Sequence, residues 1–214
     1  MAGDARAVRR RHALEIVSTV LLALAAVSTA WASYQASRWH GQQALATARG
    51  AAARVDATRA AGVANRQIQI DAATFMQWID AYSRDETELA DFYFRRFRDE
   101  FRPAVSAWIA TEPLENPGAP LTPFVLEEYS PAALEEADRL EASAGLSTED
   151  AKLDLERADR YVLCVVLFAL ALFFAGISTR LRSTSAEVAI LALGCTVFLG
   201  ALAWMATFPI SLQV

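Results

Sequence analysis

The sequence predicts an all-α membrane protein with three transmembrane helices and a helical extramembrane domain built on long extensions of the first two spans. Three apolar runs predict the spans, over residues 14–36, 161–177 and 188–210. Each run approaches or exceeds the length of about 20 residues that crosses a bilayer as a helix. The segment 37–160 between the first two runs is charged and rich in aromatic residues, and no part of it alternates as a strand does. It therefore predicts one helical domain outside the membrane.

The predicted domain is acidic. Residues 37–160 contain 14 Arg and Lys residues against 22 Asp and Glu residues, a net charge of −8. Nucleic-acid binding depends on Lys and Arg contacts to phosphate, so this charge excludes a nucleic-acid partner. The two cysteines, Cys164 and Cys195, lie in different apolar runs, and no other metal-ligating residue is near either of them in the sequence. We interpret them as small packing residues and expect no metal site and no disulfide in the domain.

Basic residues predict the orientation in the membrane, because short cytoplasmic segments carry an excess of Lys and Arg. They precede the first span, in the tail 1–13, and stand between the second and third spans, in the loop 178–187. These residues are Arg6, Arg9, Arg10, Arg11, Arg180 and Arg182. The tail and the loop are therefore predicted to be cytoplasmic, and residues 37–160 and the short tail 211–214 external.

Aromatic residues near the predicted outer ends of the spans agree with this orientation, since amphipathic rings favour the membrane interface. They are Trp31, Tyr34, Trp39, Tyr161, Trp204 and Phe208. A cleaved signal peptide ending near Ala30-Trp31-Ala32 is an alternative to the first span. The apolar run is long for a signal peptide, which favours an uncleaved anchor, and either reading leaves the domain outside.

The first span is predicted to continue as a helix to about Arg84, because residues 37–84 contain no proline and much alanine. Mostly small residues recur there at the spacing of a coiled-coil seam. The seam is Gly41, Ala44, Ala48, Ala51, Val55, Thr58, Gly62, Asn65, Gln69, Ala72, Met76 and Ile79. Its neighbour is either a helix of the same chain or a second subunit. An ordinary amphipathic helix without a coiled coil is the alternative.

After a break near residues 83–85, aromatic residues predict the core of the domain. Leu89, Phe92, Tyr93, Phe94, Phe97 and Phe101 follow at helical spacing, interleaved with arginines. Neighbouring acids balance these arginines, which favours a solvated face over a platform for stacking nucleic-acid bases.

Prolines divide the rest of the domain. Pro103 begins a short helix that ends near Thr111, and the proline-rich segment 112–131 is predicted to be an extended loop, a connector in preference to a binding element. A helix from Pro131 is expected to end before Gly145. A second helix, capped by Ser147 with Asp150, then leads into the second span.

The sequence contains no motif of an enzyme. It has no HExxH, GxSxG, CxxC or glycine-rich phosphate loop, and its many carboxylates are typical of helix surfaces. We expect no catalytic residue and no cofactor. The spans carry hydroxyls but no ionisable group at mid-membrane, which disfavours a proton-coupled pump.

Small residues in the first and third spans predict helix association, since small side chains let helices approach closely. The predicted stripe comprises Ser18, Ala25, Thr29, Ala32, Ala192, Thr196 and Gly200. We expect these faces to pack within one chain or between subunits.

Several blocks of the sequence carry a resemblance to a known group of proteins. The blocks are Trp31–Trp39 with Gly41-Gln42, Gln77–Asp80, Ala90–Tyr93, Phe101–Pro103 to Trp108, Ala119–Phe124, and Val166–Ala169 through Phe173–Ser178. Over nearly its whole length the chain resembles a family of bacterial three-span membrane proteins of unknown function. The resemblance implies the bacterial inner membrane and carries over no functional residue.

Together these features predict a non-enzymatic inner-membrane protein that self-assembles or serves a membrane partner, in a structural or accessory role. The alternative is a homo-oligomeric channel with the first span near its axis, which the hydroxyls and small residues of that span suggest. The expected partners are the lipid bilayer and a second copy or a membrane protein, and not nucleic acid.

Overall fold

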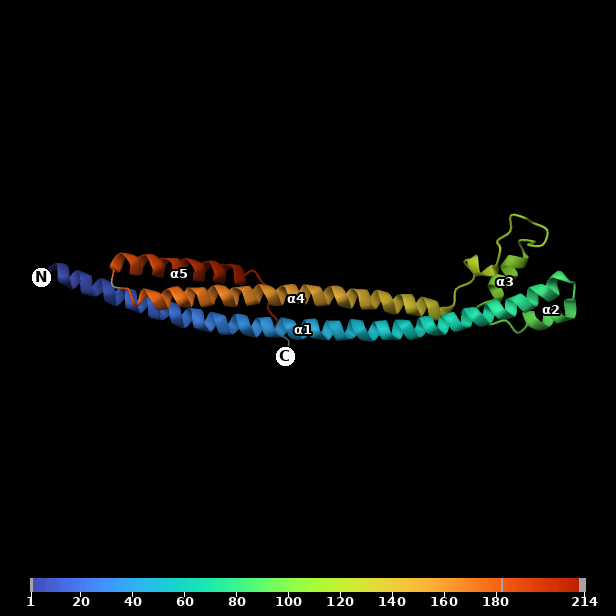
Figure 1. The fold of residues 1–214 in the computed structure, drawn as a ribbon, viewed down its shortest axis with the longest axis horizontal. Coiled ribbons are helices and arrows are strands. Elements are labelled where there is room, and N and C mark those ends of the chain that lie inside the picture. Colours follow the sequence, from blue (N-terminus) through green and yellow to red (C-terminus); the bar gives the residue numbers. More distant parts are fainter. Residues whose placement is uncertain (1, 182, 212–214) are drawn as a thin grey trace. The chain divides into compact units, whose positions relative to one another are not determined.

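A computed structural model describes the backbone of residues 2–181 and 183–211, and the side chains of residues 12–181 and 183–211. The structure is all-helical, with 80% helix and no strand in the described part. In chain order the elements are α1 (Ala2–Ser83), α2 (Thr87–Phe94), α3 (Arg102–Ile109), the 3-10 helix η1 (Pro123–Val125), α4 (Ala132–Ser178) and α5 (Thr184–Met205) (Figure 1). Helices α1, α4 and α5 are long and apolar enough to cross a membrane. The prediction of an all-α chain with three candidate spans is confirmed.

The helix bounds differ from the predicted spans in three places. The backbone is helical from Ala2, so residues 2–13 of the basic tail belong to α1, although the side chains of Arg6 and Arg9–Arg11 lie outside the described residues. Helix α5 begins at Thr184, four residues before the predicted span, and ends at Met205 instead of residue 210. The loop between α4 and α5 is therefore shorter than the predicted 178–187. Arg182 in this loop is also outside the described residues.

The predicted break at Gly145 is wrong, because α4 runs without interruption through Ala132–Ser178. Gly145 does not have the positive φ of a glycine that ends a helix. An added Cβ there would meet nothing within 4 Å, so no close contact requires glycine at this position. Ala144 and Ala151 on either side are buried. Packing of this buried face outweighs the cost of about 1 kcal/mol that glycine imposes on a helix interior.

The chain divides into two compact units. One comprises Met1–Thr47 with Thr148–Val214 and is called the span unit below; the other, Ala48–Ser147, is called the central unit. Helices α1 and α4 contribute to both units, α5 belongs to the span unit, and α2, α3 and η1 belong to the central unit.

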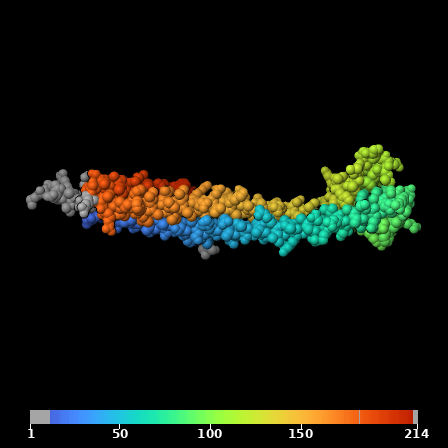
Figure 2. All heavy atoms as spheres, in the orientation of Figure 1, coloured from blue at the N-terminus to red at the C-terminus, as the bar shows by residue number. Residues whose placement is uncertain are grey.

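The span unit has a core shared by its three helices. In Figure 2 the atoms of α4 (orange) lie directly against those of α1 (blue). The core residues are Leu21, Ala25, Ala32, Ala36, Trp39, Ala158, Tyr161, Cys164, Phe168, Ala171, Ala175, Leu191, Phe198, Ala201 and Phe208. Gly194 allows a close approach of α5 to α4, because a Cβ there would lie 3.2 Å from the Cβ of Phe174. Cys164 is buried in this core as a free thiol, and Cys195 is partly buried and packs against the core.

The coiled-coil seam predicted for residues 41–79 is not covered by the chain itself, so of its two predicted neighbours only a second subunit stays a prediction. Gly50, Ala57, Ala64, Asp71 and Trp78, spaced seven residues apart, form a buried stripe of α1 in the central unit, and Phe75 and Ala81 are buried near its end. Most of the predicted seam is exposed, including Val55 at 50% and Met76 at 71%. The heptad spacing was therefore recognised, but the buried stripe is rotated from the predicted one. The larger side chains determine which face of α1 is buried. Trp78 and Phe75 pack into the aromatic core, and this orientation of the helix also turns the alanines seven residues apart inward.

That aromatic core, of Phe75, Trp78, Phe97, Phe101 and Trp108, holds the central unit together. Phe97 and Phe101 of the predicted aromatic stripe are buried in it, whereas Leu89 and Phe92 are exposed. The rings of the core meet mostly edge to face; Phe75 contacts Trp108 with centroids 5.4 Å apart and Phe124 with centroids 5.8 Å apart. Such pairs add about 0.5–1.5 kcal/mol each beyond the area that they bury. Helix α3 begins at Arg102, one residue before the predicted Pro103. Residues 95–101, predicted to continue the helix of the aromatic stripe, are turns instead.

Candidate functional site

The predicted association stripe divides between the two spans that contribute to it. Ser18, Ala25 and Ala32 are buried inside the span unit, and Thr29 is half-buried with its hydroxyl donating to the Ala25 carbonyl oxygen at 2.7 Å. The face of the first span that carries small residues therefore packs against helices of the same chain.

The residues of the predicted stripe that lie on α5 are exposed instead of buried. Ala192, Thr196 and Gly200 are exposed, and a Cβ added at Gly200 would meet nothing within 4 Å. The residues of α5 that pack internally are Leu191, Gly194, Phe198 and Ala201. The small-residue face of α5 is thus left open, and nothing in the described chain covers it.

Two polar contacts attach the chain beyond α5 to the other helices of the span unit. Gln35 on α1 is fully buried, and its side-chain oxygen accepts a hydrogen bond of 3.0 Å from the backbone N–H of Ser211. The hydroxyl of Tyr161 donates to the carbonyl oxygen of Pro209 at 3.1 Å. The ring of Tyr161 also meets that of Phe208, which in turn contacts Trp204. The predicted aromatic residues at the ends of the second and third spans therefore form one cluster.

A buried carboxylate joins three segments of the central unit. Asp71 on α1 is 1% exposed, and it accepts hydrogen bonds from Arg98 at 2.8 Å and from the Tyr129 hydroxyl at 3.0 Å. Arg98 also pairs with Glu100. Burial, followed by the hydrogen bond to Asp71, raises the pKa of Tyr129 above its ordinary value of 10.0. We call Asp71, Arg98, Glu100 and Tyr129 the Asp71 cluster. It ties the loop that follows η1 to α1, so its role is structural.

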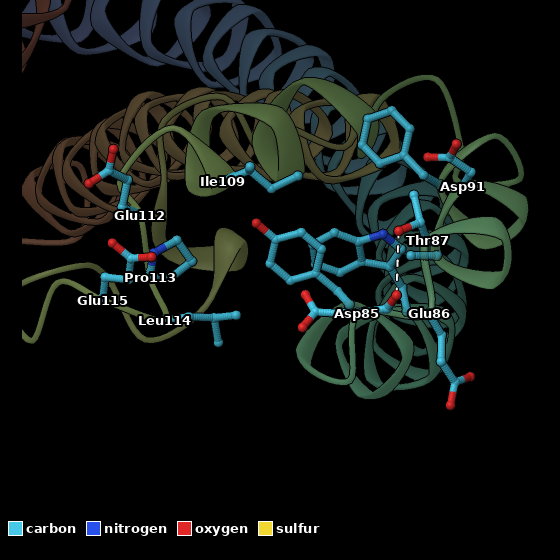
Figure 3. A pocket seen from close by; sticks show the side chains of 13 residues that line it. Asp85, Glu86, Thr87, Asp91, Ile109, Glu112, Pro113, Leu114 and Glu115 are labelled. Atoms are coloured by element: carbon cyan, nitrogen blue, oxygen red, sulfur yellow. Dashed lines mark hydrogen bonds between the residues drawn. The ribbon is translucent and has the colours of Figure 1, made fainter.

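A cavity with a volume of about 550 Å³ lies elsewhere in the central unit. Its residues come from the end of α1, from α2, and from the end of α3 with the segment that follows. Figure 3 shows Glu112, Pro113, Leu114 and Glu115 on one side of it, and Asp85, Glu86, Thr87 and Asp91 on the other. Apolar lining comes from Trp78, Tyr82, Ala90, Phe94 and Ile109. We call this site the α2–α3 pocket.

Two acidic residues with an unusual backbone stand at the rim of the pocket. Asp85 has φ of 61° and Glu112 has φ of 54°, in the left-handed region that favours glycine. Asp85 ends α1 in a Schellman motif. The N–H of Glu86 bonds to the Ala81 carbonyl at 3.0 Å, and the N–H of Asp85 bonds to the Tyr82 carbonyl at 3.3 Å. After α3 the N–H of Glu112 bonds to the Ile109 carbonyl at 3.0 Å, but Pro113 has no N–H, so the second bond of the motif is absent. Carboxylates therefore occupy two helix ends where glycine is the usual residue.

A stacked aromatic pair forms the apolar wall. The rings of Trp78 and Tyr82 lie 4.7 Å apart at an interplanar angle of 18°. Trp78 is 2% exposed, and Tyr82 covers it while keeping part of its own surface open. This wall is built on the last turns of α1, which the aromatic core of the central unit fixes in place.

Sequence reasoning identified neither the Asp71 cluster nor the pocket. Asp71 carried a signal, because it is the one acid on a heptad of otherwise apolar or small positions, but the chosen register placed it off the seam. The pocket carried no signal, since Asp85 and Glu112 adopt their conformation only at helix ends that tertiary packing defines. Among the residues that the structure describes, no group of three His, Cys, Asp or Glu side chains is arranged to hold a metal ion.

Comparisons with known proteins add no further assignment: no family model, no curated protein and no solved structure matches the chain.

Proposed function

We propose that this chain is a non-enzymatic inner-membrane protein that self-associates in a structural or accessory role. Three helices anchor it, and the central unit stands on the external side. The observation that carries the proposal is the second heptad stripe of α1. Val55, Gly62, Gln69 and Met76 are seven residues apart, and none of them is buried in the chain. A helix in water with two heptad-spaced faces, one filled by its own chain and one open, is suited to a second partner.

A second copy is the partner that fits best. Copies in one membrane share an orientation, so their α1 helices are parallel, and equivalent positions face one another in a parallel coiled coil. Gly62 and Gln69 between the two apolar positions fit a close but modest contact, because small and polar residues bury little apolar area. The open face of α5 offers a second contact of the same kind.

A homo-oligomeric channel with the first span near its axis is the alternative. It receives less support, because the hydroxyl-bearing face with Ser18 is covered by the same chain. The exposed large residues of this span are apolar or aromatic. They are Ile16, Val17, Val20, Leu24, Val27, Trp31 and Tyr34. A channel would conduct ions or solutes after reconstitution, whereas the proposed assembly would not.

Cysteine crosslinking tests the proposed assembly. In a background with Cys164→Ala and Cys195→Ala, we expect Val55→Cys and Met76→Cys to form disulfide-linked dimers on mild oxidation in membranes. Asp56→Cys is the matched control: it is adjacent in sequence, and its position in the heptad keeps equivalent residues too far apart for the geometry of a disulfide. Light scattering of the wild type in nanodiscs gives the mass. A monomer by mass, or equal crosslinking at positions 55 and 56, would overturn the proposal.

A further inference from the structure

The α2–α3 pocket has the size and form of a ligand site. Its volume of about 550 Å³ falls within the range of about 300–1,000 Å³ that is usual for pockets binding small molecules. Its lining combines an apolar wall with a few polar groups at the rim, which is the common composition of such sites. All of it belongs to the central unit.

The charge of the pocket is strongly one-sided. Five of its lining residues are acids, and none is Lys, Arg or His. These acids are Asp85, Glu86, Asp91, Glu112 and Glu115. In the described part of the chain no ion pair involves any of them. Several other acids of the same unit do pair with arginine, as in Asp56 with Arg59, Asp80 with Arg84, and Glu136 with Arg139.

The aromatic wall adds a preference for the same kind of ligand. The face of an aromatic ring is negative, so a cation placed over it is attracted, and the attraction grows as water is excluded. Tyr82, stacked on Trp78, presents such a wall next to the carboxylate of Asp85. An anion would be repelled by the rim, and a neutral apolar molecule would gain no attraction from the carboxylates.

We propose that the α2–α3 pocket binds an organic cation, namely an ammonium or guanidinium group carried on an apolar body. The apolar body packs against Phe94 and Ile109, and the charge lies over the Tyr82 ring, toward the rim formed by Asp85, Glu112 and Glu115. This inference is independent of self-association, because every residue involved belongs to one copy of the central unit. The same chemistry is found in a free amine and in a basic side chain of a partner protein.

A pair of probes of equal size tests the requirement for charge. The full chain is purified in a non-ionic maltoside detergent, since lipid headgroups with ammonium groups would compete. Phenethylamine, protonated at pH 7, and neutral 2-phenylethanol are titrated while tryptophan fluorescence is recorded. We expect saturable binding of phenethylamine that weakens as salt is added, and binding of 2-phenylethanol at least about tenfold weaker. Equal affinity for the two probes, or no saturation by phenethylamine, would overturn the proposal.

Variants locate the site. Asp85→Asn/Glu112→Gln/Glu115→Gln removes three charges and keeps the side-chain shapes, and asparagine tolerates the left-handed conformation at position 85. We expect this triple variant to bind phenethylamine about tenfold more weakly. Glu127→Gln/Glu128→Gln, in the same unit but outside the pocket, is the matched control and should bind like the wild type. An unchanged affinity in the triple variant, at an unchanged melting temperature, would reject the pocket as the site.

If the triple variant fails to fold, Tyr82→Leu provides a second route. It keeps an apolar side chain and removes the ring, so it should weaken phenethylamine more than 2-phenylethanol, whereas an equal effect on both would count against a cation site. A blocked Lys-Phe dipeptide distinguishes the two sources of the ligand. Tighter binding than that of phenethylamine assigns the site to a partner's side chain, and weaker binding assigns it to a free amine.

Discussion

At the scale of single residues, the Asp71 cluster fixes the loop after η1 more firmly than apolar contacts alone. A buried carboxylate is costly unless its hydrogen-bonding capacity is used, and Asp71 uses it on Arg98 and Tyr129. Removing one partner would leave the carboxylate partly unsatisfied, at a cost of about 1–3 kcal/mol. The Asp71 cluster therefore holds the segment around Tyr129 against α1, and its loss would free that segment.

The raised pKa of Tyr129 makes the stability that the Asp71 cluster contributes sensitive to alkaline pH. Above about pH 10 the unfolded chain releases the tyrosine proton while the folded chain retains it, so stability is complete below pH 10 and falls as the pH rises beyond it. We expect Tyr129→Phe to be less stable than the wild type at pH 8, and the difference to shrink by pH 11.5. Urea unfolding of the full chain in detergent, followed by near-UV circular dichroism, measures this. Tyr93→Phe, in α2 and outside the Asp71 cluster, is the control; a constant difference for Tyr129→Phe would contradict the expectation.

At the scale of elements, what the sequence could predict depended on the strength of the local signal. The three apolar runs were predictable, because long hydrophobic patterns survive any tertiary context. The aromatic core was predictable only in part, since Phe97 and Phe101 are buried but Leu89 and Phe92 are exposed. The face of α1 that packs within the chain was not predictable, since alanines at many positions fit several seams equally well. Only Trp78 and Phe75 distinguish these seams. The break at Gly145 was predicted from a local preference that the buried face of α4 overrides.

Two glycines test the continuity of α4 and the packing of α5. Gly145→Ala should raise stability by about 0.5–1 kcal/mol, because alanine favours a helix interior and the added methyl group meets open space. Gly194→Ala should lower stability by about 1–3 kcal/mol, because its Cβ would lie only 3.2 Å from the Cβ of Phe174. Thermal unfolding in one detergent compares both variants with the wild type. A destabilising Gly145→Ala would indicate that α4 is broken at that residue after all.

At the scale of the whole molecule, the ends of the span unit differ in character. One end carries the short connection with Arg180 between α4 and α5, and the other carries the cluster of Tyr161, Trp204 and Phe208. Basic connections favour the cytoplasmic side, and aromatic rings favour a membrane interface. In the proposed orientation the connection is cytoplasmic, and the chain that enters and leaves the central unit is external.

Labelling of single cysteines in intact cells decides this orientation. In the background without Cys164 and Cys195, Glu127→Cys places an exposed thiol in the central unit, and Arg180→Cys places one in the connection between α4 and α5. A maleimide that does not cross the membrane should label position 127 in intact cells and position 180 only after permeabilisation, because the arginines hold their connection on the cytoplasmic side. The reverse pattern would invert the orientation and place the α2–α3 pocket inside the cell. An organic cation would then have to reach it from the cytoplasm, so the same experiment decides which compartment can supply the ligand.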